Sequence, residues 1–122
     1  MDYLVVDIAR TLDESSHGQR ASEELAKLWG MAQDEVQALR ARAAAGDDEA
    51  GDRAAALEAQ AIQDIERRKD TMRRELLDRV RTIVTAIAAE RQVSLVLRAD
   101  QVLAFSPESE ITDEVLVRLD RL

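Results

Sequence analysis

The sequence contains no cysteine, so disulfides, paired-cysteine redox centres and cysteine-ligated zinc sites are excluded. Its aromatic side chains are only Trp29, Tyr3 and Phe105, and Pro107 is its single proline. No apolar run approaches the length of a membrane span. With so few large side chains, a compact core would be marginal for a chain of 122 residues. These absences favour one domain built from long helices and stabilised by association with further chains.

Charged side chains are abundant and unevenly distributed. Seventeen basic and twenty-five acidic residues give a net charge of −8. This balance argues against a general nucleic-acid binder, which needs a basic face to displace counterions from phosphates. Residues 1–61 carry six basic and thirteen acidic side chains, whereas residues 62–91 carry eight and six. A locally basic segment therefore lies within an acidic protein.

Apolar residues at spacings of three and four predict two long helices. The first helix is expected from about residue 19 to 45, and its apolar stripe comprises Leu25, Leu28, Ala32, Val36, Leu39 and Ala43. The second is expected from about 53 to 91, with a stripe of Leu57, Ala61, Ile65, Met72, Leu76, Val80, Ile83 and Ile87. Apolar density rises after residue 76, which predicts that the base of the second helix is better buried than its tip.

Turn and cap signals delimit the two helices. Ser15 or Ser16 can cap the start of the first helix. Gly46 and Gly51 bracket three acidic residues between the helices, and glycine terminates helices readily. The sequence therefore predicts a long antiparallel helical hairpin with its tip at about 46–52.

Three short apolar runs near the chain ends predict strands: YLVVDI at 3–8, SLVL at 94–97 and VLAF at 102–105. Pro107 should end the last strand, and Thr112 begins a short amphipathic helix. Three strands per chain are too few for a stable sheet with closed edges. Several chains pooling their strands would close those edges and form an oligomeric β-core that carries helical arms.

Four segments together resemble the Skp/OmpH family of periplasmic chaperones: LVVDIARTLDES, ASEELAKL, LVLRADQVLAF and ITDEVLVRL. The closing strand pair and helix of that family are matched by Leu95, Val96, Leu97, Val102, Leu103, Phe105, Ile111, Thr112, Val115 and Leu119. The resemblance implies a homotrimer in which strands from three subunits form a small β-barrel body and three helical hairpins surround a cavity. It also implies ATP-independent holding of unfolded outer-membrane proteins.

The expected fold class is therefore α+β and mainly α, with a coiled-coil arm on a trimeric β-barrel. Residues 1–18 and 92–122 would form the trimerisation body with its short C-terminal helix, and residues 19–91 the arm. The expected trimer interface comprises Leu4, Val6, Leu95, Leu97, Val102, Leu103 and Phe105. The resemblance implies a periplasmic location with a signal peptide removed, since no signal peptide follows Met1 in this sequence.

Two sets of arm residues are candidates for contact with client proteins. The apolar set is Trp29, Met31, Val36, Leu39, Leu57, Ile65 and Met72. The electrostatic set is Arg67, Arg68, Lys69, Arg73 and Arg74. For Trp29 and Met31 we favour packing against the partner helix, and for the basic run a solvated helix face with i,i+4 pairs of roughly 0.3 kcal/mol each. Well-known members of the family have basic arms, so no lipopolysaccharide site is carried over to this acidic chain.

No catalytic residue, metal ligand or cofactor is expected. His17 is flanked by Ser15, Ser16 and Gly18, which indicates a helix start and not a nucleophilic triad. The acidic run at 47–52 lacks the ligand spacing of a calcium loop. The expected partners are the chain itself and unfolded outer-membrane β-barrel proteins, not nucleic acid; contact with a membrane surface stays open. A structural or adaptor coiled-coil protein of the cell envelope, without general client binding, is the alternative.

Overall fold

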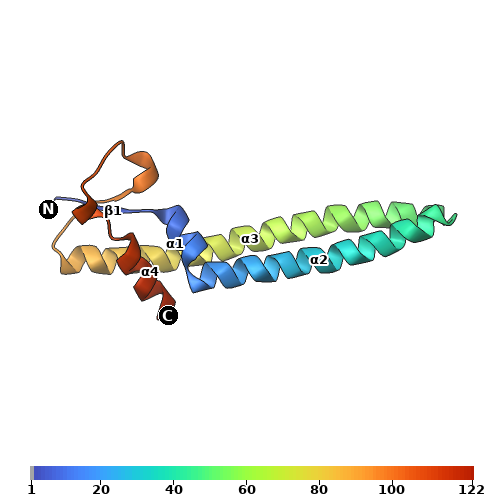
Figure 1. Ribbon diagram of the computed structural model, residues 1–122, viewed down its shortest axis with the longest axis horizontal. Helices are drawn as coiled ribbons and strands as arrows, with labels where there is room; N and C mark the ends of the chain where they lie inside the picture. Colours follow the sequence, from blue (N-terminus) through green and yellow to red (C-terminus); the bar gives the residue numbers. More distant parts are fainter. Residues whose placement is uncertain (1) are drawn as a thin grey trace. The chain divides into compact units, whose positions relative to one another are not determined.

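A computed structural model describes residues 2–122, which are mainly helical (Figure 1). Its elements follow the order β1 (Leu4–Val6), α1 (Ile8–Glu14), α2 (Ser16–Ala44), α3 (Asp48–Glu90), β2 (Val96–Arg98), the 3₁₀ helices η1 (Ala99–Gln101) and η2 (Pro107–Ser109), and α4 (Thr112–Asp120). Four α-helices and one two-stranded sheet within residues 2–122 confirm the mainly helical α+β class.

The chain divides into two compact units. Unit 1 comprises the residues up to 20 and from 73 onward, and unit 2 comprises residues 21–72. Helices α2 and α3 contribute residues to both units. The division into a body and an arm at residues 18 and 92, which the sequence predicts, stays a prediction.

Strand β1 is the central element of the unit 1 sheet. It pairs in parallel with β2, with Leu4 opposite Val96. On its other side the Val5 carbonyl accepts a hydrogen bond of 2.9 Å from the Ile111 backbone N–H. All three β1 residues are buried, as expected for a strand that is covered on both faces and reads as a continuous apolar run. Within residues 2–122 no further strand covers the outer edge of β2.

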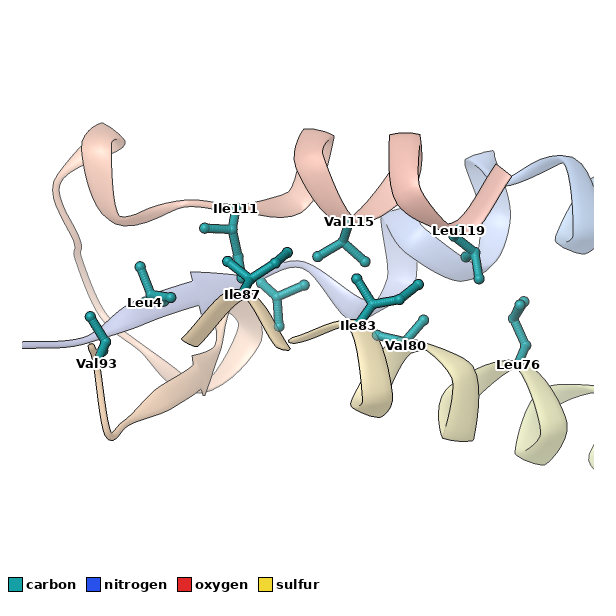
Figure 2. Packing of buried hydrophobic residues seen from close by; sticks show 10 residues of the cluster. Leu4, Leu76, Val80, Ile83, Ile87, Val93, Ile111, Val115 and Leu119 are labelled. Atoms are coloured by element: carbon teal, nitrogen blue, oxygen red, sulfur yellow. The ribbon is translucent and has the colours of Figure 1, made fainter. Parts of the chain in front are cut away.

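The hydrophobic core of unit 1 lies between α3, α4 and the sheet. In Figure 2, Val115 and Leu119 on α4 point towards the Val80 and Ile83 side chains of α3. The buried members of this core are Leu4, Val6, Leu76, Val80, Ile83, Ile87, Val93, Ile111, Val115 and Leu119. The last four positions of the second predicted apolar stripe, 76 to 87, are therefore confirmed as core.

Unit 2 consists of the facing parts of α2 and α3, joined at residues 45–47. Gly46 has a φ angle of 110°, a backbone conformation that favours glycine. Near this turn Val36 and Leu39 pack with the small residues Ala50 and Ala54, which let the two helices approach closely. The tip thus has a small core of its own, but α3 contributes only two buried alanines to it, whereas four large apolar residues of its base are buried. The prediction that the base of this helix is better buried than its tip is confirmed.

Several element boundaries differ from the sequence predictions. Helix α3 begins at Asp48, so Gly51 lies inside the helix and not in the turn. Residues 102–105 form no strand within the described chain, although the Val102 backbone is extended. A strand needs a partner for its N–H and C=O groups, and the neighbouring segments of the same chain supply none. Pro107 begins η2 and does not end a strand.

Helix α1 is not predicted by the sequence pattern, because it has only seven residues and a mixed face. Asp7 caps it, since its side chain accepts a hydrogen bond of 3.1 Å from the Arg10 N–H. The Asp7 N–H in turn donates to the Thr112 hydroxyl oxygen at 3.0 Å. Thr112 starts α4, so this bond holds α1 and α4, which are far apart in the sequence, against each other.

Ion pairs further attach α4 to α3. Both guanidinium Nη atoms of Arg118 donate to the carboxylate of Glu90, at 3.0 and 2.6 Å, and Arg118 also pairs with Glu114 at 3.0 Å. The hydrogen bonds from Arg118 lower the pKa of the Glu90 carboxyl, and the charges of Arg118 and Arg91 act in the same direction. The pair is solvent-exposed, so its contribution is modest.

The lowered pKa of Glu90 predicts a specific dependence of stability on pH. A carboxyl whose pKa is lower in the folded state stabilises the fold above its unfolded pKa, about 4.3, and loses this contribution as the pH falls through the folded value. We expect the Glu90→Gln variant to be less stable than the parent at neutral pH and equally stable in strong acid. Urea denaturation at a series of pH values measures this difference. A gap between the two proteins that stays constant down to strong acid would contradict the assignment.

Candidate functional site

Unit 2 contains a groove between its two helical segments. It has a volume of about 320 Å³, near the lower end of the roughly 300–1,000 Å³ that is typical of ligand sites. Its apolar lining residues are Leu28, Met31, Ala32, Leu57, Ala61 and Ile65, and its polar ones are Glu35, Gln60, Asp64 and Arg68. Along the groove, the apolar residues of the two helices are mostly only half-buried, so they leave space between the helices. Nearer the turn, the buried cluster around Val36 fills this space.

The polar rim of the groove contains charges with different surroundings. Asp64 accepts a hydrogen bond of 3.0 Å from Gln60 and lies 3.7 Å from a guanidinium nitrogen of Arg67. Glu35 and Arg68 take part in no ion pair within residues 2–122. Two unpaired charges of opposite sign therefore border an apolar floor.

The structure places the seven apolar candidates for client contact in different environments. Met31, Leu57 and Ile65 are brought together in the groove. Val36 and Leu39 lie in the small core near the turn and are not accessible there. Sequence periodicity places Val36 and Leu39 on the stripe of the first helix and Leu57 and Ile65 on that of the second. Only the packing shows which members of a stripe remain accessible.

The remaining apolar candidates lie outside the groove. Met72 is half-buried and does not line it. Trp29 is 37% exposed, compared with 62% for Met31 in the groove. The packing of these two side chains against the partner helix stays a prediction. Leu28, Ala32 and Ala61 line the groove but are missing from the sequence-based set, although the apolar stripes contain all three.

All five basic candidates are exposed. Arg67 pairs with Asp64, and within residues 2–122 the other four, Arg68, Lys69, Arg73 and Arg74, have no acidic partner in ion-pair range. The i,i+4 pairs that the sequence predicts for this run are therefore not formed. Arg68 alone lines the groove.

The seven trimer-interface candidates fall into two groups within unit 1. Leu4 and Val6 lie in the core of the chain itself. Leu95 is 49% exposed, Leu103 is fully exposed, and Leu97, Val102 and Phe105 are half-buried. The segment from β2 to η2, drawn in orange in Figure 1, thus presents apolar side chains that the rest of unit 1 leaves uncovered.

His17, the sole histidine of the sequence, lies beside an arginine side chain. The Nδ1 atom of His17 lies 3.3 Å from a guanidinium nitrogen of Arg79, and no carboxylate orients the ring within residues 2–122. No group of three or more histidine, cysteine, aspartate or glutamate side chains in the described chain could hold a metal ion. None of the helices between residues 2 and 122 is long and apolar enough to cross a bilayer.

Comparison with known proteins gives one family. The family model described as "Outer membrane protein (OmpH-like)" matches residues 48–119, which is more than half of the chain and includes α3, β2 and most of α4. A comparison with curated proteins gives no significant match. The matched region contains one wall of the groove and the exposed apolar segment of unit 1.

Proposed function

Since the chain belongs to the OmpH-like family, whose members are periplasmic chaperones and not enzymes, we propose that it is an ATP-independent holdase for unfolded outer-membrane proteins. It works in the periplasm as a homotrimer with a β-strand body and helical arms. The observation that carries the proposal is the apolar groove of unit 2, because it offers shallow, solvent-accessible contact area to an extended chain. Shallow contacts release a client without an energy source.

The exposed apolar segment of unit 1 supports the proposed trimer. A two-stranded sheet is marginal in water, and the outer edge of β2 lacks a partner within residues 2–122. Contacts with neighbouring subunits would bury Leu95 and Leu103 and supply that partner. The strand predicted at residues 102–105 would then form between subunits, where its backbone groups find acceptors and donors.

Substitution of Leu103 by aspartate tests the trimer directly. Because Leu103 is fully exposed in the single chain, Leu103→Asp should leave the subunit folded and reduce the molar mass in solution from three chains towards one. Leu97→Asp, in β2, should have the same effect on mass. Light scattering on a sizing column, with circular dichroism as a check of folding, measures both.

Leu122→Asp is the matched control for this experiment. Leu122 is also exposed but lies outside the proposed interface, so its variant should keep the mass of the parent. A parent protein with the mass of one chain, or a Leu103→Asp variant that remains a trimer, would contradict the proposed body.

A dilution assay tests the holdase activity. An outer-membrane β-barrel protein unfolded in urea is diluted into buffer with and without the chain, in the absence of nucleotide, and its aggregation is followed by light scattering. We expect the chain to suppress aggregation, and the Met31→Ser variant to suppress it more weakly, because Met31 is a largely exposed lining residue of the groove. Aggregation that is unchanged at molar excess would refute the proposal.

A structural or adaptor protein of the cell envelope is the second candidate. The acidic balance of residues 1–61 favours it, since the members of the family best known for holding clients tend to have basic arms. An adaptor would form the same trimer but would not suppress the aggregation of several unrelated β-barrel proteins. The dilution assay therefore separates the two functions.

A further inference from the structure

The charges of unit 2 indicate which client segments the groove prefers. Residues 21–72 contain twelve acidic and seven basic side chains, so the surface around the groove carries an excess of negative charge. At the groove itself, Glu35 has no ion-pair partner within residues 2–122. An unpaired carboxylate beside an apolar floor attracts a cation that is attached to an apolar chain.

The dimensions of the groove limit the length of the segment that it holds. Its lining covers residues 28–35 on α2 and 57–68 on α3. At about 1.5 Å per helical residue these stretches are about 10 and 16 Å long. An extended peptide advances about 3.3 Å per residue, so three to five client residues fit.

We propose that the groove selects short extended segments of unfolded clients in which apolar side chains alternate with lysine or arginine. The apolar side chains contact Leu28, Met31 and Ile65, and a client cation lies beside Glu35. Successive side chains of an extended segment point to opposite sides, so apolar side chains on the floor leave the cations on the solvent side. From there the long side chain of lysine or arginine can bend towards Glu35, which is exposed at the rim. This specificity rests on the proposed holdase function and assigns a sequence preference to it.

Arg68 opposes this preference and provides an internal test. It lines the groove without an acidic partner, so it repels a basic client segment. The Arg40–Glu58 ion pair fixes the register of the two helices and serves as a reference point. At about 1.5 Å per residue, Glu35 lies about 7.5 Å from this pair along the helices, and Arg68 lies about 15 Å from it in the same direction. The two charges therefore act on different positions of a bound segment.

Binding of short synthetic peptides to the full-length protein tests the proposal. Three fluorescein-labelled peptides alternate leucine with lysine, glutamine or glutamate, and fluorescence anisotropy gives their dissociation constants. We expect the leucine–lysine peptide to bind about three- to tenfold more tightly than the leucine–glutamate peptide, with a difference that shrinks as salt is added. Emission of Trp29, next to the lining residue Leu28, reports binding independently because the peptides lack tryptophan.

Two substitutions that each remove one negative charge test whether the preference for lysine depends on the groove. Glu35→Gln should weaken leucine–lysine binding about two- to fivefold, whereas Asp34→Asn, at the preceding position, which is also exposed but does not line the groove, should not change it. Arg68→Gln should strengthen binding of the same peptide. Equal effects of Glu35→Gln and Asp34→Asn would overturn the assignment to the groove.

The outcomes also separate this inference from the holdase function. If the protein suppresses aggregation of outer-membrane proteins but binds the lysine and glutamate peptides equally, the preference is refuted and the holdase function stands. Tighter binding of the leucine–glutamate peptide refutes it as well. If aggregation is not suppressed and no peptide binds, both proposals fail.

Discussion

Replacing Gly18 by alanine is expected to destabilise the protein by about 2–3 kcal/mol. A Cβ atom at Gly18 would lie 1.6 Å from the Leu12 carbonyl oxygen and 2.8 Å from its carbon. These are backbone atoms of α1 and cannot move aside like the end of a flexible side chain. The Gly18 N–H also donates to the Ser15 hydroxyl at 3.0 Å, so a displaced α2 start would lose this bond.

Gly30→Ala is the matched control, because a Cβ at Gly30 meets no atom within 4 Å. The same substitution in the same helix should therefore stabilise the protein by up to about 1 kcal/mol through helix propensity. Urea denaturation followed by circular dichroism measures both variants at one fixed protein concentration, since association adds to apparent stability. Similar effects of the two substitutions would show that α1 does not approach α2 as closely as described.

Replacing Ile87 by alanine is expected to cost about 3 kcal/mol of the free energy of unfolding. Ile87 is fully buried in the unit 1 core between the sheet and α4, among neighbours that include Leu4 and Ile111 (Figure 2). Removing its outer carbon atoms leaves a cavity that these neighbours fill only in part. Since the core also positions β1, partial loss of the proposed trimer should accompany the change.

Ile62→Ala removes the same atoms from an exposed position of the same helix. Ile62 is 47% exposed and belongs to neither hydrophobic cluster. Its replacement should change stability by less than about 0.5 kcal/mol. Comparable losses for Ile62→Ala and Ile87→Ala, measured by urea denaturation, would contradict the description of the core.

The candidate site could be predicted only in part from residue types. The periodicity of the sequence correctly places Leu57 and Ile65 on the inner stripe of a helix, because that stripe depends on local spacing alone. It cannot distinguish Val36, which is covered near the turn, from Leu28 of the same stripe, which lines the groove. This difference arises from the small alanines opposite Val36, and their position depends on the register of two helices that are separate in the sequence.

The sequence by itself determined the long helices, the glycine turn at Gly46 and the short helix after Thr112, because each depends on residues within a few positions of one another. The tertiary structure decided which segments pair with β1 and which apolar residues remain exposed. Val5 meets Leu97 and Glu110 only after about a hundred residues of chain have folded back. The VLAF segment is apolar in the sequence, yet within one chain no strand edge meets it. A strand forms only where a neighbouring strand pairs with its backbone N–H and C=O groups. When the two segments are far apart in the sequence, tertiary packing and not local residue preference decides which segments pair.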